Sequence, residues 1–137
     1  MTVELEDLKA MWQGLKAHVD LLAGERQQYL DFFEQSPEAY VVTDALGAIA
    51  DLNGAAVDIL QRRKAYLRGK PMVVLVALEQ RGEFRRRLRA IAQGTPQAPW
   101  LATLLAPESR TEARLSARRI GPPGEDAGIC WLLQPAP

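Results

Sequence analysis

The first 33 residues carry an apolar repeat that limits what this chain can fold into. The large apolar residues recur at alternating steps of three and four, with Arg26 at the one interrupted position: Leu5, Leu8, Trp12, Leu15, Val19, Leu22, Tyr29 and Phe33. This spacing is the a/d signature of a coiled-coil seam, whereas a helix packed on its own domain usually shows a wider apolar face. At 1.5 Å per residue, such a helix would be about 45 Å long. The pattern predicts a helix over residues 5–33 that pairs with a second copy of the chain, and a helix folded back on its own domain is the alternative.

Composition places the remaining residues in one ordinary globular domain. Of 137 residues, 47% are hydrophobic and 25% are charged, and 17 basic side chains balance 17 acidic ones, so no net charge attracts nucleic acid or an anionic membrane. The single cysteine, Cys130, excludes an internal disulfide and a cysteine-based metal cluster. The start of the chain lacks the pattern of a signal peptide, and no apolar run is long enough for a membrane span. These features predict a cytosolic protein with no metal site.

The middle of the chain reads as two strands followed by helices. Ser36-Pro37 should end the first helix, and β-branched residues predict strands at 39–44 and 48–52 around a turn at Gly47. Asn53 is a good N-cap for a short helix that extends to Leu60. Residues 62–68 suit a charged turn or a short helix. Residues 72–78 are an apolar run, and its hydrophobic periodicity does not distinguish a brief helix from a buried connector. Residues 79–93 predict a longer helix that stops at Gly94.

Three strands are expected in the last third, at residues 100–106, 111–120 and 128–134. The second alternates apolar and polar residues, so that Ala113, Leu115 and Ala117 should form its buried face. The third is apolar on both faces, which predicts that both are covered, the outer one by the N-terminal helix.

This order of elements, together with several short motifs, resembles a PAS domain. The opening Phe33-Glu-Gln-Ser-Pro-Glu-Ala-Tyr-Val-Val-Thr-Asp44, followed by Gly47, Ile49 and Asn53-Gly-Ala-Ala56, is similar to the start of that family. Leu67-Arg-Gly-Lys-Pro71 is similar to the turn after the small PAS helices. The resemblance covers about residues 30–134.

The resemblance implies an α+β fold, with a five-stranded antiparallel sheet in the order 2-1-5-4-3 and with short helices and one longer helix on one face. We expect a long amphipathic helix for dimerisation at residues 1–36 and the PAS domain at 37–137. The implied function is a sensory module that homodimerises and relays a small-molecule or partner signal to an effector, such as a kinase or a transcription regulator. The chain ends without the Asp-Ile-Thr common in the family, so either it is a fragment or its output leaves through the N-terminal helix.

The expected input site is a pocket between sheet and helices, which should take an apolar ligand unless its own side chains fill it. The alternation of the strands assigns nine residues to its lining: Val41, Thr43, Ile49, Leu60, Leu67, Leu88, Leu115, Cys130 and Leu132. Trp131, on the opposite face of the last strand, is then assigned to the dimer interface together with the seam residues.

Known PAS cofactors find little support in these residues. The light-sensing flavin members need a cysteine after the Gly-turn, where this chain reads Gly69-Lys-Pro-Met-Val-Val74. Haem-binding members commonly use a histidine from the longer helix, and the one histidine here, His18, lies in the seam. The sequence therefore disfavours both thiol-adduct flavin chemistry and histidine-ligated haem, and it identifies no other cofactor.

Catalysis and nucleic-acid binding are also disfavoured. The expected domain has no histidine and no phosphate-binding glycine loop, and Asp44 and Asp51 fall on a hairpin where turn-forming carboxylates are common. Five arginines between residues 81 and 89 lack interleaved aromatic residues for base stacking. The alternative to a sensor is an adaptor without a ligand, in which this basic helix and the coiled coil join protein partners.

Overall fold

The computed structural model describes residues 30–121 and 127–136, and the chain divides into two compact units, Met1–Phe33 and Glu34–Pro137. Residues 30–35 are helical, so the first helix ends just before Ser36-Pro37, as predicted. Among the expected seam residues only Phe33 is described. The heptad prediction for Leu5 to Tyr29 therefore lies outside the described residues.

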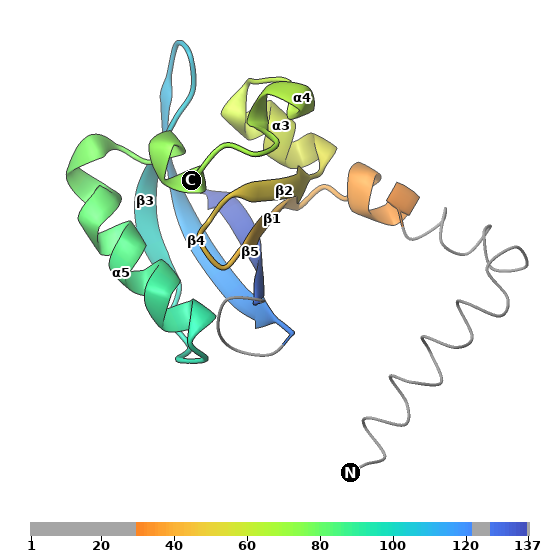
Figure 1. The fold of residues 1–137 in the computed structure, drawn as a ribbon. Helices are drawn as coiled ribbons and strands as arrows, with labels where there is room; N and C mark the ends of the chain where they lie inside the picture. The colour runs from red at the N-terminus through yellow and green to blue at the C-terminus, as the bar shows by residue number, and fades with distance from the viewer. Residues whose placement is uncertain (1–29, 122–126, 137) are drawn as a thin grey trace, which may run out of the picture. The chain divides into compact units, whose positions relative to one another are not determined.

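The second unit is built on one five-stranded antiparallel sheet (Figure 1). Its order, β2-β1-β5-β4-β3, is the predicted one. The first and last strands of the chain, β1 and β5, thus lie side by side in the centre. The strands are β1 (Ala39–Asp44), β2 (Ile49–Leu52), β3 (Trp100–Leu105), β4 (Arg110–Ile120) and β5 (Gly128–Pro135).

The β1–β2 hairpin depends on a glycine and an aspartate. Gly47 adopts a φ of 90°, a conformation that favours glycine, and a Cβ there would lie 3.0 Å from Cδ2 of Leu88. The Oδ1 of Asp44 accepts hydrogen bonds from the backbone N–H groups of Leu46 and Ala48, both at 2.9 Å. Asp44 is therefore a turn-forming residue, as expected from its position in the sequence.

Short helices follow the hairpin. Asn53 caps α3 (Gly54–Leu60) by accepting a hydrogen bond from the N–H of Ala56, which confirms the predicted N-cap. The charged segment contains α4 (Lys64–Leu67). The run that periodicity could not assign forms two 3₁₀ helices, η1 (Met72–Leu75) and η2 (Leu78–Gln80).

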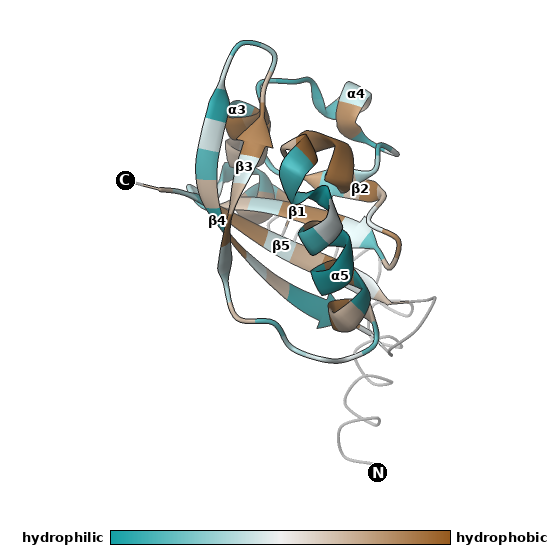
Figure 2. Cartoon of the chain, turned by 90° about the vertical axis from the view of Figure 1, so that its left-hand side faces the viewer, coloured by the Kyte–Doolittle hydropathy of each residue, from teal (hydrophilic) through white to brown (hydrophobic). Residues whose placement is uncertain are grey.

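The longer predicted helix is α5 (Arg81–Ala92), and Gly94 after it has a φ of 93°. It begins two residues later than expected because η2 occupies the start of the segment. Phe84, Leu88 and Ile91 are buried, and the helix packs against β4 and β5. Figure 2 shows its opposite side as mostly hydrophilic. In Figure 1, α3 and α4 lie near the β2 edge of the sheet and α5 lies near β3 and β4.

Candidate functional site

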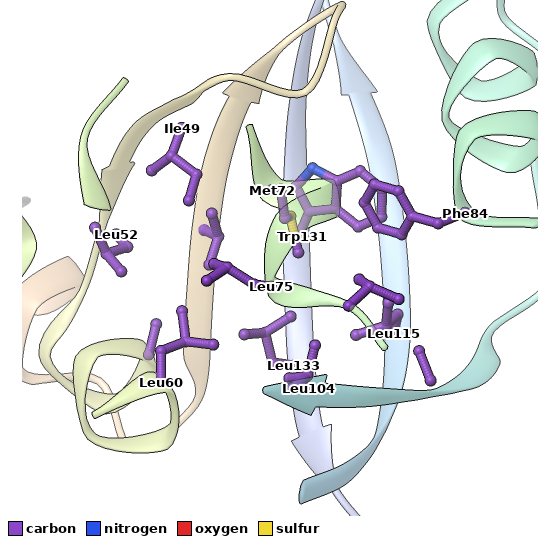
Figure 3. Close-up of a cluster of buried hydrophobic side chains, with 14 of the residues drawn as sticks. Ile49, Leu52, Leu60, Met72, Leu75, Phe84, Leu104, Leu115, Trp131 and Leu133 are labelled. Atoms are coloured by element: carbon purple, nitrogen blue, oxygen red, sulfur yellow. The ribbon is translucent and has the colours of Figure 1, made fainter. Parts of the chain in front are cut away.

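A single cluster of buried hydrophobic side chains lies between the sheet and the helices (Figure 3). Trp131 is fully buried in it, and its ring stacks on Phe84 with 5.0 Å between centroids. The ring of Trp100 meets Trp131 edge-on at 6.0 Å. Of the nine predicted lining residues, seven are buried on this inner side: Val41, Thr43, Ile49, Leu60, Leu67, Leu88 and Leu115. They form core packing, and their binding of an apolar ligand stays a prediction.

The assignment of the two faces of β5 was wrong. Cys130 and Leu132 lie half-buried on the outer face, and the buried residues of this strand are Ile129, Trp131 and Leu133. Directly paired residues of antiparallel strands share a face, and Trp131 pairs with buried Val41 on β1 and with Ala117 on β4. Because Trp131 is packed inside its own domain, it is not available for a dimer interface.

The half-buried outer position also affects the thiol. Partial burial raises the pKa of Cys130, so its thiolate is disfavoured at neutral pH. The thiol is thus a weak nucleophile.

Two buried polar side chains hold the core strands together. The indole N–H of Trp131 donates to the Oγ1 of Thr43 at 3.0 Å, and the Thr43 hydroxyl donates to the C=O of Asp44. Asn53 is completely buried, accepts from the N–H of Tyr40 and of Ala56, and donates to the C=O of Glu38. All these groups are satisfied by partners within the domain, which indicates a structural role.

The acidic residues of the hairpin are likewise engaged in structure. Asp51 accepts from Arg68 and is paired with Lys64, which also pairs with Glu34. Despite an opposing contribution from partial burial, hydrogen bonds from the Leu52 N–H, Lys64 and Arg68 lower the pKa of Asp51. In the described ranges, no group of three or more His, Cys, Asp or Glu side chains could hold a metal ion.

The exposed side of α5 carries a partly neutralised row of arginines. Glu83 binds Arg86, with 2.6 Å between Oε1 and Nη2, and Arg87, with 2.9 Å between Oε1 and Nε. These hydrogen bonds, that of Arg86 first, lower the pKa of Glu83 to about 2. The guanidinium of Arg87 also lies over the ring of Trp100. Within the described part of the chain, Arg85 and Arg89 form no ion pair, so they leave uncompensated positive charge on this helix.

A separate pocket of about 370 Å³ opens at the C-terminal end of α5. It is lined by Ile91, Gly94, Thr95, Pro96, Gln97, Ala117, Arg118 and Arg119. None of these residues was assigned to a site from the sequence. The available signal was the unequal length of the two paired strands, since β3 has 6 residues and β4 has 11.

The sheet order β2-β1-β5-β4-β3, with short helices and one longer helix, defines the described domain as a small α+β module. A family model described as "PAS fold" matches residues 33–135. The chain belongs to the PAS fold family. PAS domains are generally sensory or regulatory modules. A search of curated proteins found no match.

Solved structures agree on the fold. The PAS domain of an HTR-like protein from Haloarcula marismortui is similar with a TM-score of 0.73 at 14% identity, over 88% of this chain and 99% of that one. A domain of the sensory box sensor histidine kinase/response regulator from Geobacter sulfurreducens has a TM-score of 0.66 at 19% identity, over 81% and 95% of the two chains. The PAS domain of a protein from Colwellia psychrerythraea gives 0.68 at 15%, over 79% and 94%. No helix among the described residues is both long and apolar enough to span a membrane.

Proposed function

We propose that this chain is a non-catalytic signal-transduction module that homodimerises through residues 5–33 and relays a small-molecule or partner signal to an effector. The observation that carries the proposal is the PAS fold itself, seen in the family match and in the sheet order. The Geobacter domain, described as part of a sensor histidine kinase/response regulator, supports an effector of the kinase or response-regulator kind. The cytosolic location expected from the sequence remains part of this proposal.

Dimerisation is supported by the heptad repeat in the sequence. Eight of its nine a and d positions are large apolar residues, and such a seam needs a partner helix to bury it. A dimer would bring two PAS domains and their effectors together, and a change in the helix pair could then carry the signal.

The test is native mass spectrometry of the full chain purified from its own host. The expected spectrum is that of a dimer. A double change in the seam, Leu15→Lys with Leu22→Lys, should give monomers, because it places charges at two d positions. The matched control, Ala17→Lys at an outer f position, should stay dimeric. A monomeric wild-type chain would refute dimerisation through this segment.

The same spectra separate a sensor from an adaptor. Extra mass that is lost on denaturation would establish a retained small molecule. A dimer whose mass equals that of two chains, with no bound small molecule, would favour the second candidate, an adaptor without a ligand. That candidate is favoured by one specific observation, the uncompensated charge of Arg85 and Arg89 on α5.

For the adaptor, α5 would bind an acidic protein partner. Reversing charge with Arg85→Glu, Arg86→Glu and Arg89→Glu should abolish co-purification of that partner, while Arg114→Glu on the sheet should not. Under the sensor proposal, all these variants should retain the partner.

A further inference from the structure

Among the described residues, the edge of β4 has no neighbouring strand along part of its length. Residues 110–115 of β4 pair with β3, but residues 116–120 pair only with β5. Two main-chain hydrogen bonds near the end of β4 show which of its residues direct their N–H and C=O groups towards β5 and which towards β3. The N–H of Ala136 donates to the C=O of Glu112, and the N–H of Ala106 donates to the C=O of Ser109.

Main-chain groups alternate along an antiparallel strand, so even-numbered residues of β4 bond to β5 and odd-numbered residues point towards β3. Ala117 and Arg119 therefore direct their N–H and C=O groups to the side where β3 is absent. Within residues 30–121 and 127–136, these main-chain groups find no hydrogen-bond partner.

Two prolines explain why β3 does not extend further towards its N-terminus. The strand begins at Trp100, directly after Pro99. If the register with β4 continued, Pro96 would lie opposite Arg119. Proline has no N–H and cannot complete a ladder. Gly94, with its positive φ, then turns the chain back to α5. The space between this loop and β4 is the pocket of about 370 Å³, near the lower end of the roughly 300–1,000 Å³ usual for ligand sites.

Among the described residues, the lining combines apolar side chains with two arginines, Arg118 and Arg119, and contains no acidic side chain. Ile91 supplies the apolar wall, and Thr95 and Gln97 supply a hydroxyl and an amide. Arg119 has intermediate exposure, and its guanidinium donates an exposed hydrogen bond to the C=O of Gly121. A guanidinium has five N–H donors, so others remain to bind a carboxylate, and such charge-assisted hydrogen bonds are strong.

We propose that this pocket binds a small organic carboxylate that also carries an amide, as an N-acylated amino acid does. The carboxylate pairs with Arg119, the amide pairs with the free main-chain groups of Ala117, and the apolar side chain lies on Ile91. The ligand thus occupies the place that a longer β3 would fill. This site lies beside the core and touches it through Ile91, and its occupancy does not depend on dimerisation or on an effector.

The test is NMR titration of the ¹⁵N-labelled full chain with the N-acetyl derivatives of alanine, valine, leucine and glutamate. Binding of at least one should shift the amide resonances of Ala117, Arg119 and Thr95 saturably. The amide analogue of that compound, which lacks the carboxylate, should bind at least tenfold more weakly. If no member of the panel shifts these resonances, the proposal is overturned.

Variants of two arginines on β4 test whether Arg119 binds the carboxylate. Arg119→Gln should weaken binding at least tenfold, whereas Arg119→Lys, which keeps a positive charge, should retain part of the affinity. Arg114→Gln removes an exposed arginine from the outer face of the same strand and should bind as the wild type does. Well-dispersed spectra of each variant show that it is folded. Equal affinity of the Arg119→Gln and Arg114→Gln variants would contradict the assignment of Arg119.

Discussion

Asn53 links three segments through one buried side chain. Its Oδ1 accepts from the N–H of Tyr40 on β1 and of Ala56 in α3, and its Nδ2 donates to the C=O of Glu38. The sequence predicted the helix cap but gave no sign of the other two bonds, because those partners are 13 and 15 residues away. Long-range hydrogen bonds of this kind are decided by packing, which local patterns do not encode.

Asn53→Ala should lower the free energy of unfolding by about 2–4 kcal/mol, because it removes a helix cap and leaves buried backbone groups unpaired. Urea denaturation followed by fluorescence would measure the change. Asn53→Asp retains the acceptor but loses the donor, so it should recover only part of the loss. A value below about 0.5 kcal/mol for the alanine variant would contradict this role, since changes of that size are usual for surface sites.

Thr43→Val, which keeps the shape of the side chain, should destabilise the domain by about 1–3 kcal/mol, because the buried indole N–H of Trp131 would lose its acceptor. Thr43→Ser retains the hydroxyl and should lose less. Denaturation of the two variants under the same conditions compares them. A valine variant as stable as the serine variant would show that the hydrogen bond contributes little.

Among the secondary structure elements, α5 has a stability that should depend on pH. The folded-state pKa of Glu83 is lowered to about 2 from an ordinary value of 4.5. A group with a lowered folded-state pKa stabilises the fold above its unfolded pKa, and this stabilisation is lost as the pH falls through the folded value. The ion pairs are exposed, so salt should weaken them.

Glu83→Gln should therefore lower the melting temperature at pH 6–7, and the difference from the wild type should shrink steadily between pH 4.5 and pH 2. Thermal melts across this range, at low and high salt, would measure it. Glu108→Gln removes an exposed carboxylate that has no ion pair among the described residues, and its effect should be small at neutral pH. A difference for Glu83→Gln that does not change with pH would contradict the argument.

The strands show where the sequence was informative and where it was not. Alternation correctly identified the buried face of β4, because Ala113 and Leu115 are flanked by the polar residues Glu112, Arg114 and Ser116. In β5 every residue from Ile129 to Leu133 is apolar, so alternation could not distinguish inside from outside, and Trp131 was placed on the wrong face. Its pairing with Val41 and Ala117 decides the face, and pairing is a property of the whole sheet.

The pocket beside β4 was missed for a related reason. The sequence predicted both strands with nearly the observed lengths and marked Gly94 as a helix stop. It did not show that the unpaired end of β4 would lie opposite the loop with Pro96, since this requires the register between the strands. Unequal strand lengths combined with prolines are the signal that could have indicated an open edge.

For the whole molecule, the heptad repeat in the sequence predicts a dimer whose weakest seam position is Arg26. Arg26→Leu would bury an apolar side chain in place of a charged one, which is worth about 1.5–3 kcal/mol. The dimer dissociation constant should therefore fall at least tenfold. Sedimentation equilibrium would measure the constant, and Ala17→Leu at an outer position should leave it nearly unchanged. An unaltered constant for Arg26→Leu would count against the heptad assignment.

Trp131 has a further consequence for how the chain avoids misfolding. A one-residue slip of β5 would turn Cys130 and Leu132 inward, and the slipped strand would still present an apolar face to the core. Hydrophobic patterning alone thus leaves two competing alignments of similar quality. Only the native one stacks the indole on Phe84 and gives its N–H an acceptor. These two contacts of Trp131 favour the native alignment over the slipped one, so Trp131→Leu should cost uniqueness of the native state as well as stability.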